Sequence, residues 1–203
     1  MAGPTATEAA PFLARLTRLD PDALVRLRPA GPDRVVLWGR VPWGVLVTRT
    51  VPGGPVGDVS VGAAALLRSL TDGDGTLPPS RDRDWRWPLP PGPGQVIEAL
   101  PGSEVRRLGT AAAQTLREAR GRVGERALRD ALLEYVPIVV TAGDKKIEIR
   151  QGLVQAVLRM AFMSTDSVGD VTVRVAGTWV GLAAEYGSVW LQNTPSLAIH
   201  VAK

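Results

Sequence analysis

The chain has 203 residues, of which 45% are hydrophobic and 22% charged, so it is long enough for one large domain or two small ones. It contains no Cys and one His, which excludes disulfides, thiolate zinc sites and cysteine nucleophiles. Its net charge of +4 is a mild bias, too small to indicate nucleic-acid binding by itself.

The basic residues are almost all arginine, with 21 Arg against 3 Lys. Guanidinium groups bind phosphates and carboxylates through two parallel hydrogen bonds. A GC-rich genome produces the same excess without any chemical role, so both interpretations stay open. The N-terminal residues lack the pattern of a signal peptide, and no run of about 18 apolar residues occurs. We therefore expect a cytoplasmic protein that does not span a membrane.

The first third of the chain predicts a helix followed by a β-meander. Phe12 and Leu16 have helical spacing, and Thr5 and Glu8 have the spacing of a capping box, so a helix is expected over 8–19. Apolar runs between Pro and Gly turns predict short strands, and an Ala- and Leu-rich run predicts a short helix. The expected strands cover 24–28, 34–40, 45–51 and 58–61, and the short helix covers 63–70.

A long irregular stretch, rich in Pro, Gly, Arg and Trp, separates the two ends of the chain. It runs over 71–94 and has the composition of a mobile loop or an interdomain linker. After it we expect a strand, two helices, a hairpin, a third helix and several closing strands. These elements are expected over 95–99, 103–119, 125–135, 137–141, 145–149, 151–163, 170–176, 179–184, 188–191 and 197–201.

Together the elements indicate an α+β fold, built mostly of antiparallel sheets with helices on one face. We divide the chain into an N-terminal α+β unit over 1–70, a loop or linker over 71–100 and a C-terminal α+β unit over 101–203. The alternative is that both units pack as one domain.

Two stretches of the chain share one order of elements, which is a strand, a loop, a short alternating strand and a helix that ends in Leu-Arg. With the neighbouring elements, this order gives repeated β-α-β-β-β units. The first stretch consists of 45–48, 58–61 and 65–68, and the second consists of 138–141, 146–149 and 156–159.

This repeated unit resembles that of the DNA sliding clamps, in which sheets form the outside and helices the inside of a ring. The resemblance implies a clamp-like fold, and it implies that basic residues on the inner helices face duplex phosphate. Residues 103–135 depart from the pattern because they predict two helices where a clamp unit has one. Matched by position, the implied phosphate contacts are Arg15, Arg18, Arg68 and Arg159.

No group of residues in the sequence identifies a reaction. His200, the single histidine, lies three residues from the end, where neither a triad nor a metal cluster is expected. No Gly-rich phosphate loop stands between a strand and a helix. We therefore predict no catalytic residue, metal site or cofactor. Three carboxylate pairs are candidates for glycoside or metal chemistry, and they are Asp72 with Asp74, Asp82 with Asp84, and Asp166 with Asp170. The first pair fits a turn and the second fits ion pairs with neighbouring arginines better than catalysis.

Six Trp residues are unusual in a chain with two Tyr and two Phe. Four of them fall on expected strands or turns, where packing explains them. Trp85 and Trp87 lie in the irregular stretch beside Arg83 and Arg86, a composition typical of interface hot spots and of surfaces that stack nucleobases. These four residues are our candidate binding site. The alternative is a segment that folds back and buries both rings against the sheet.

The two helices around Gly121 offer another mode of DNA binding, a helix-turn-helix that places arginines such as Arg126 and Arg129 near the duplex. Glu125 and Asp130 interleave with these arginines, and such mixing is typical of a solvated helix face.

The sequence therefore predicts a non-enzymatic binding or scaffold protein whose partner is a protein or a nucleic acid, including clamp-like association with DNA. Two alternatives stay open. One is an enzyme that uses Asp or Glu with Arg, and the other is a structural protein that forms a homo-oligomer.

Overall fold

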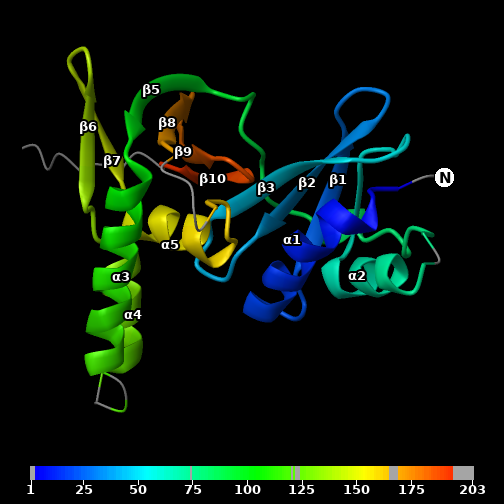
Figure 1. The fold of residues 1–203 in the computed structure, drawn as a ribbon, viewed down its shortest axis with the longest axis horizontal. Helices are drawn as coiled ribbons and strands as arrows, with labels where there is room; N and C mark the ends of the chain where they lie inside the picture. Colours follow the sequence, from blue (N-terminus) through cyan, green and yellow to red (C-terminus); the bar gives the residue numbers. More distant parts are fainter. Residues whose placement is uncertain (1–2, 74, 120, 122–123, 165–168, 194–203) are drawn as a thin grey trace, which may run out of the picture.

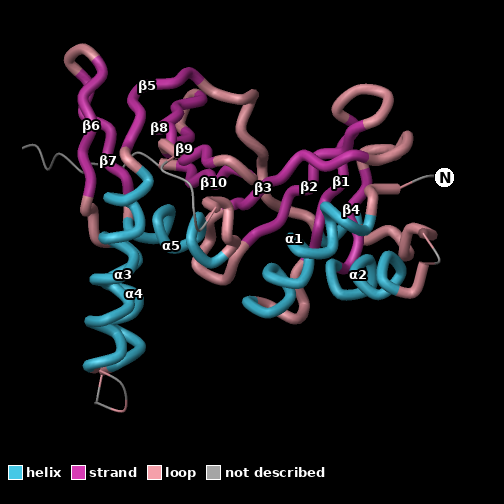
Figure 2. Tube along the Cα trace, in the orientation of Figure 1, coloured by secondary structure: helices cyan, strands magenta, loops and turns pink. Residues whose placement is uncertain are grey.

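The computed structural model describes residues 3–73, 75–119, 121, 124–164 and 169–193. The central feature of this part of the chain is an eight-stranded antiparallel sheet (Figures 1 and 2). In spatial order its strands are β4 (Val59–Gly62), β1 (Leu24–Pro29), β2 (Arg34–Arg40), β3 (Leu46–Pro52), β10 (Gly187–Gln192), β9 (Trp179–Ala184), β8 (Val171–Ala176) and β5 (Gln95–Leu100).

The helices lie on one side of this sheet, as the sequence predicts. Helices α1 (Ala6–Leu19), α2 (Ala63–Thr71) and α5 (Gln151–Arg159) lie below it in Figure 1. Helices α3 (Gly102–Glu118) and α4 (Glu125–Glu134) pack against α5 and extend away from the sheet. No helix in the described residues is both long and apolar enough to cross a membrane.

A separate hairpin of two short strands stands beside these helices. Its strands are β6 (Ile138–Ala142) and β7 (Lys145–Ile149), which pair only with each other among the described strands. The order β7-α5-β8-β9-β10 is one full β-α-β-β-β unit of the expected clamp-like kind.

The main core lies between the sheet and the helices, and it follows from the two periodicities of the sequence. Helix α1 buries Phe12 and Leu16 one turn apart, while β2 buries Val35 and Leu37 at alternate positions. Phe12 stacks on Phe162, which follows α5, with the ring centroids 6.3 Å apart. This contact joins the N-terminal and C-terminal parts of the chain.

The two halves of the sheet have equivalent strand orders on either side of the central pair, β3 and β10. From this centre outward the strands run β3-β2-β1-β4 on one side and β10-β9-β8-β5 on the other. Helix α1 precedes β1 as α5 precedes β8, and α2 follows β4 as α3 follows β5. The sequence repeat instead aligns β3 and β4 with the hairpin strands β6 and β7, which lie outside the large sheet. The symmetric arrangement is therefore a finding of the structure.

Some local expectations differ from the structure. Thr5 precedes α1 without a side-chain capping bond, and Glu8 pairs with Arg49 on β3 instead of closing a capping box. Helix α5 ends at Arg159, four residues before the expected end, because the chain turns at Ala161, whose φ is 51°. The expected strand over 197–201 lies outside the described residues.

An ion-pair cluster joins the edge strand β4 to its neighbour β1. Arg26 donates to both carboxylate oxygens of Asp58, at 2.6 and 2.9 Å, and Arg28 Nε lies 3.1 Å from Asp58 Oδ2. These contacts, first of all the hydrogen bond from Arg26, lower the pKa of the Asp58 carboxyl from 3.8. A carboxyl whose pKa is lowered by folding stabilises the protein above its unfolded pKa and loses that contribution as the pH falls through the folded value.

We expect Asp58→Asn to lower the free energy of unfolding by roughly 0.5–1 kcal/mol at pH 7, because the cluster is partly exposed to solvent. The difference from the wild type should shrink as the pH falls below the ordinary pKa of 3.8, because the unfolded chain then binds a proton at Asp58 before the folded protein does. Urea unfolding at pH 7 and near pH 2.5 measures both values. Asp130→Asn removes an exposed carboxyl of α4 and is the control. An equal difference at both pH values would contradict this assignment.

Candidate functional site

The face of the sheet away from the helices carries the strongest candidate for a binding site, and we call it the open face. Strand alternation places Trp38, Thr48, Ser188 and Ala183 on it in one row, because each pairs with the next across β2, β3, β10 and β9. Trp190, two residues after Ser188, lies on the same face. The small side chains in this row leave a hollow beside the two indoles.

The segment 85–94 crosses the open face and walls this hollow. Trp85 is 9% exposed and packs in a cluster with Trp179 and Trp190. Farther along the segment, Arg174 Nη1 donates to the carbonyl of Pro93 at 3.1 Å. Gly94 has a φ of +73°, and a Cβ there would lie 2.9 Å from the Trp190 ring, so this turn requires glycine.

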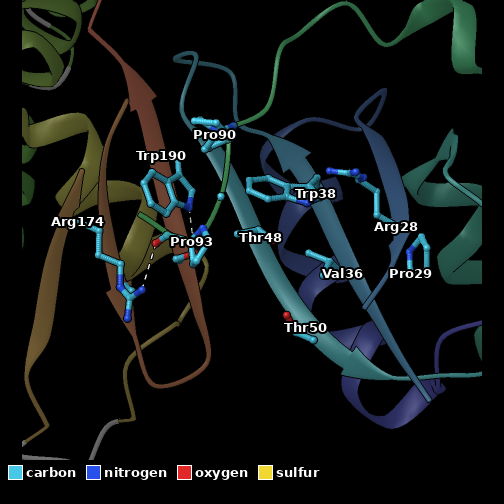
Figure 3. A pocket seen from close by; sticks show the side chains of 14 residues that line it. Arg28, Pro29, Val36, Trp38, Thr48, Thr50, Pro90, Pro93, Arg174 and Trp190 are labelled. Carbon is cyan, nitrogen blue, oxygen red and sulfur yellow. Dashed lines mark hydrogen bonds between the residues drawn. The ribbon is translucent and has the colours of Figure 1, made fainter. Parts of the chain in front are cut away.

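The result is a groove of about 400 Å³ between strands and segment. Figure 3 shows Trp38 and Trp190 on its two sides with Pro90 and Pro93 between them. Its floor is formed by small side chains of β3, β9 and β10, which are Thr48, Thr50, Ala183 and Ser188.

Two features make the groove chemically distinctive. Arg28 and Arg174 line it from opposite ends, and no Asp or Glu lines it in the described part of the chain. Thr48 is only 7% exposed, and its Oγ1 has no hydrogen-bond partner among the described residues. A buried hydroxyl without a partner costs about 1–3 kcal/mol of stability.

We expect Thr48→Val to raise the free energy of unfolding of the free protein by about 1 kcal/mol, because it replaces the unpartnered hydroxyl by a methyl group of similar shape. Thr172→Val is the matched control, since Thr172 Oγ1 donates to the carbonyl of Ala183 at 3.3 Å. That variant should lose about 0.5–1.5 kcal/mol. Urea denaturation measures both, and equal losses would show that Thr48 Oγ1 has a partner in solution.

The sequence-predicted binding residues lie next to this groove rather than in it. Trp85 agrees with the alternative of a segment that folds back against the sheet. Its ring is buried, and its Nε1–H donates to the carbonyl of Trp87 at 2.8 Å. Trp87 is half-buried, edge-on to Trp85 with centroids 5.3 Å apart, and the Arg40 guanidinium lies 5.0 Å from its centroid. Arg83 and Arg86 are exposed. A binding role for these four residues stays a prediction.

The four arginines implied by the clamp resemblance lie on the three helices that cover the sheet. Arg15 and Arg18 are on α1, Arg68 is on α2 and Arg159 is on α5. None of them forms an ion pair within the described part of the chain. The one acidic residue on these helices is Glu8, which pairs with Arg49. These helices therefore present positive charge only.

Helices α3 and α4 differ in this respect. Arg107 pairs with Glu104 at 3.4 Å, and Arg129 lies 3.7 Å from Glu125. Acidic and basic residues thus neutralise each other on this pair, as expected for a solvated face. Arg120 and Arg122, which flank Gly121 between the two helices, lie outside the described residues.

Two of the candidate carboxylates, Asp82 and Asp84, serve as local anchors. Asp82 accepts the Ser60 backbone N–H at 2.5 Å and the Ser80 hydroxyl at 2.6 Å, and these bonds, the Ser80 bond first, lower its pKa. Asp84 pairs with Arg81 at 2.7 Å. Within the described residues no three His, Asp or Glu side chains converge as a metal site. Asp74, Asp166 and His200 lie outside them.

Sequence reasoning did not find the residues that form the groove, which are Trp38, Thr48, Trp190, Arg28 and Arg174. The strand pattern places Trp38 and Thr48 on one face, but nothing local indicates that β10 pairs with β3. The groove depends on that pairing.

Comparison with solved structures places the fold among the bacterial DNA sliding clamps. The DNA polymerase III subunit beta from Pseudomonas aeruginosa matches with a TM-score of 0.59 and 11% identity, covering 95% of this chain and 64% of that chain. The sliding clamp from Caulobacter crescentus matches with a TM-score of 0.58 and 11% identity, covering 100% of this chain and 69% of that chain. The beta clamp from Helicobacter pylori gives 0.58 and 10%, covering 100% and 67%.

These matches confirm the clamp-like fold predicted from the sequence, although this chain spans only about 64% of the length of the Pseudomonas protein. Residues 89–196, more than half of the chain, match a family described as a domain of unknown function (DUF8185), and the chain belongs to this family. Residues 2–88 match a second domain of unknown function (DUF8010). No curated protein matches the sequence.

Proposed function

We propose that this protein is a non-enzymatic binding protein that holds an extended segment of a partner protein in the groove of the open face. The observation that carries the proposal is the solvent-open hollow lined by Trp38, Trp190 and the prolines of the segment 85–94, with Thr48 on its floor. Ligand sites combine such apolar walls with a few polar groups that fix orientation.

An extended peptide fits this groove better than a compact ligand. The groove is open to solvent along the sheet and has a volume of about 400 Å³, near the lower limit for enclosed ligand sites of roughly 300–1,000 Å³. Indole and proline surfaces pack well against the flat sides of an extended backbone, as in grooves that bind proline-rich segments.

The test is selection from a displayed library of random peptides, followed by affinity measurement with the enriched sequences. We expect Trp38→Ala to weaken their binding at least tenfold, because it removes one wall of the groove. Tyr135→Ala, which removes an aromatic side chain that is 60% exposed at the end of α4, should leave the affinity unchanged. Failure to enrich any sequence, or equal binding by Trp38→Ala, would overturn the proposal.

A second candidate function is association with duplex DNA through the helices, which the unpaired Arg15, Arg18, Arg68 and Arg159 favour. Positive charge without intervening acids attracts phosphate and makes the affinity depend on salt. The fold of the sliding clamps supports this candidate, and fluorescence anisotropy with a labelled duplex at several salt concentrations tests it.

A further inference from the structure

We infer that the groove of the open face selects acidic peptide segments, in which Arg28 and Arg174 bind carboxylates while an apolar or aromatic side chain packs against Trp38. The inference rests on the proposed function and names the chemistry of its ligand. The supporting observation is that two oriented guanidinium groups lie at opposite ends of the groove, and no described carboxylate lines it.

Both guanidinium groups are held in place and still have free donors. Arg28 uses Nε for Asp58 Oδ2, at 3.1 Å, and Asp58 already has two bonds from Arg26. The terminal nitrogens of Arg28 therefore remain for a ligand. Arg174 uses Nη1 for the Pro93 carbonyl, at 3.1 Å, and its Nη2 has no partner among the described residues. Arginines oriented in this way lose little side-chain entropy when they bind a carboxylate.

The position of the two arginines sets the length of the segment. Arg28 lies on β1 and Arg174 on β8, which are five strand steps apart in the sheet. At about 4.8 Å per step this is about 24 Å, and an extended peptide that rises about 3.3 Å per residue covers it in about seven residues. The ligand is therefore a short extended segment with acidic residues toward both ends.

The aromatic walls favour a peptide over single-stranded nucleic acid, which would also bring negative charge. Base stacking requires an open ring face. Trp190 is only 3% exposed, and a Cβ built on Gly181 or Gly94 would lie 2.6 or 2.9 Å from its ring, so the chain covers this indole closely. Trp38 alone offers a partly open ring. The groove therefore offers one indole to an apolar side chain and no pair of surfaces for successive bases.

The experiment uses three fluorescein-labelled peptides of about eight residues with the same central Trp-Pro pair, flanked by Asp, by Asn or by Lys. Anisotropy titrations compare their affinities for the full-length protein at low and moderate salt. We expect the Asp peptide to bind about tenfold tighter than the Asn peptide and the Lys peptide to bind weakest. Arg28→Gln and Arg174→Gln should each remove most of this preference and leave the Asn peptide unaffected.

Two controls separate charge recognition from other effects. Arg126→Gln makes the same change in net charge at an exposed position of α4 and should preserve the preference. Arg28→Lys keeps the charge beside Asp58 and should retain part of the preference, which excludes a loss caused by misfolding. Equal binding of the Asp and Asn peptides would overturn the inference and leave the proposed function standing. No binding of any peptide would overturn both, and tighter binding of labelled oligothymidine would replace the peptide with single-stranded DNA.

Discussion

Phe162→Ala is expected to lower the free energy of unfolding by about 3–5 kcal/mol, the range for truncating a buried Phe. Phe162 is 1% exposed and stacks on Phe12 of α1, so its ring fills the core at the junction between the two halves of the sheet. Removing it leaves a cavity that Phe12 cannot fill without leaving its own contacts. Because the ring touches both halves, the whole chain should lose stability in a single transition.

Urea unfolding followed by far-ultraviolet circular dichroism and by tryptophan fluorescence measures this effect, since Trp residues occur in both halves. Tyr135→Ala, which truncates an exposed aromatic side chain, should cost less than about 1 kcal/mol. A single shifted transition would favour the alternative in which the units over 1–70 and 101–203 pack as one domain. Two transitions, with only one moved, would favour the separate domains that the sequence predicts.

The local structure of this chain could be predicted because it depends on local pattern. The alternation of Val35 and Leu37 between exposed or half-buried neighbours gives β2 its exact limits, and the spacing of Phe12 and Leu16 gives α1 its buried face. The end of α5 was missed because it depends on Ala161, a residue with no local signal for a left-handed conformation.

The candidate site could not be predicted in the same way, because it depends on pairing between distant segments. Val47 and Val189 are partners in the sheet, although β3 and β10 lie toward opposite ends of the chain. Only this pairing brings Thr48 beside Ser188 and sets Trp190 across from Trp38. Trp85 could not be placed from sequence for the same reason. The composition of the segment around it indicates an interface, but its burial depends on strands far away in the sequence.

Replacing Arg15, Arg18, Arg68 and Arg159 together by Gln is expected to have the largest effect on any binding of duplex DNA. Each phosphate contact contributes about 0.9 to the slope of log affinity against log salt concentration, so four lost contacts should reduce that slope by about 3.6. At low salt the affinity should fall by several orders of magnitude, while folding should change little because these side chains pair with no described carboxylate. Anisotropy with a labelled duplex at salt concentrations of about 50–200 mM measures both quantities.

The matched control removes four arginines from the other helices, namely Arg107 and Arg117 on α3 with Arg126 and Arg129 on α4. It changes the net charge equally, so any effect of overall charge should be the same in both variants. If the two variants lose affinity to the same extent, α1, α2 and α5 do not form a dedicated phosphate-binding surface. The binding would then be a nonspecific attraction of the duplex to the net positive charge. If the unmodified protein binds no duplex at low salt, the helices have no phosphate partner, and the groove alone carries the function. Because the two surfaces lie on opposite faces of one sheet, the groove variant Trp38→Ala should leave the salt dependence unchanged, and this independence distinguishes a two-sided scaffold from a single binding surface.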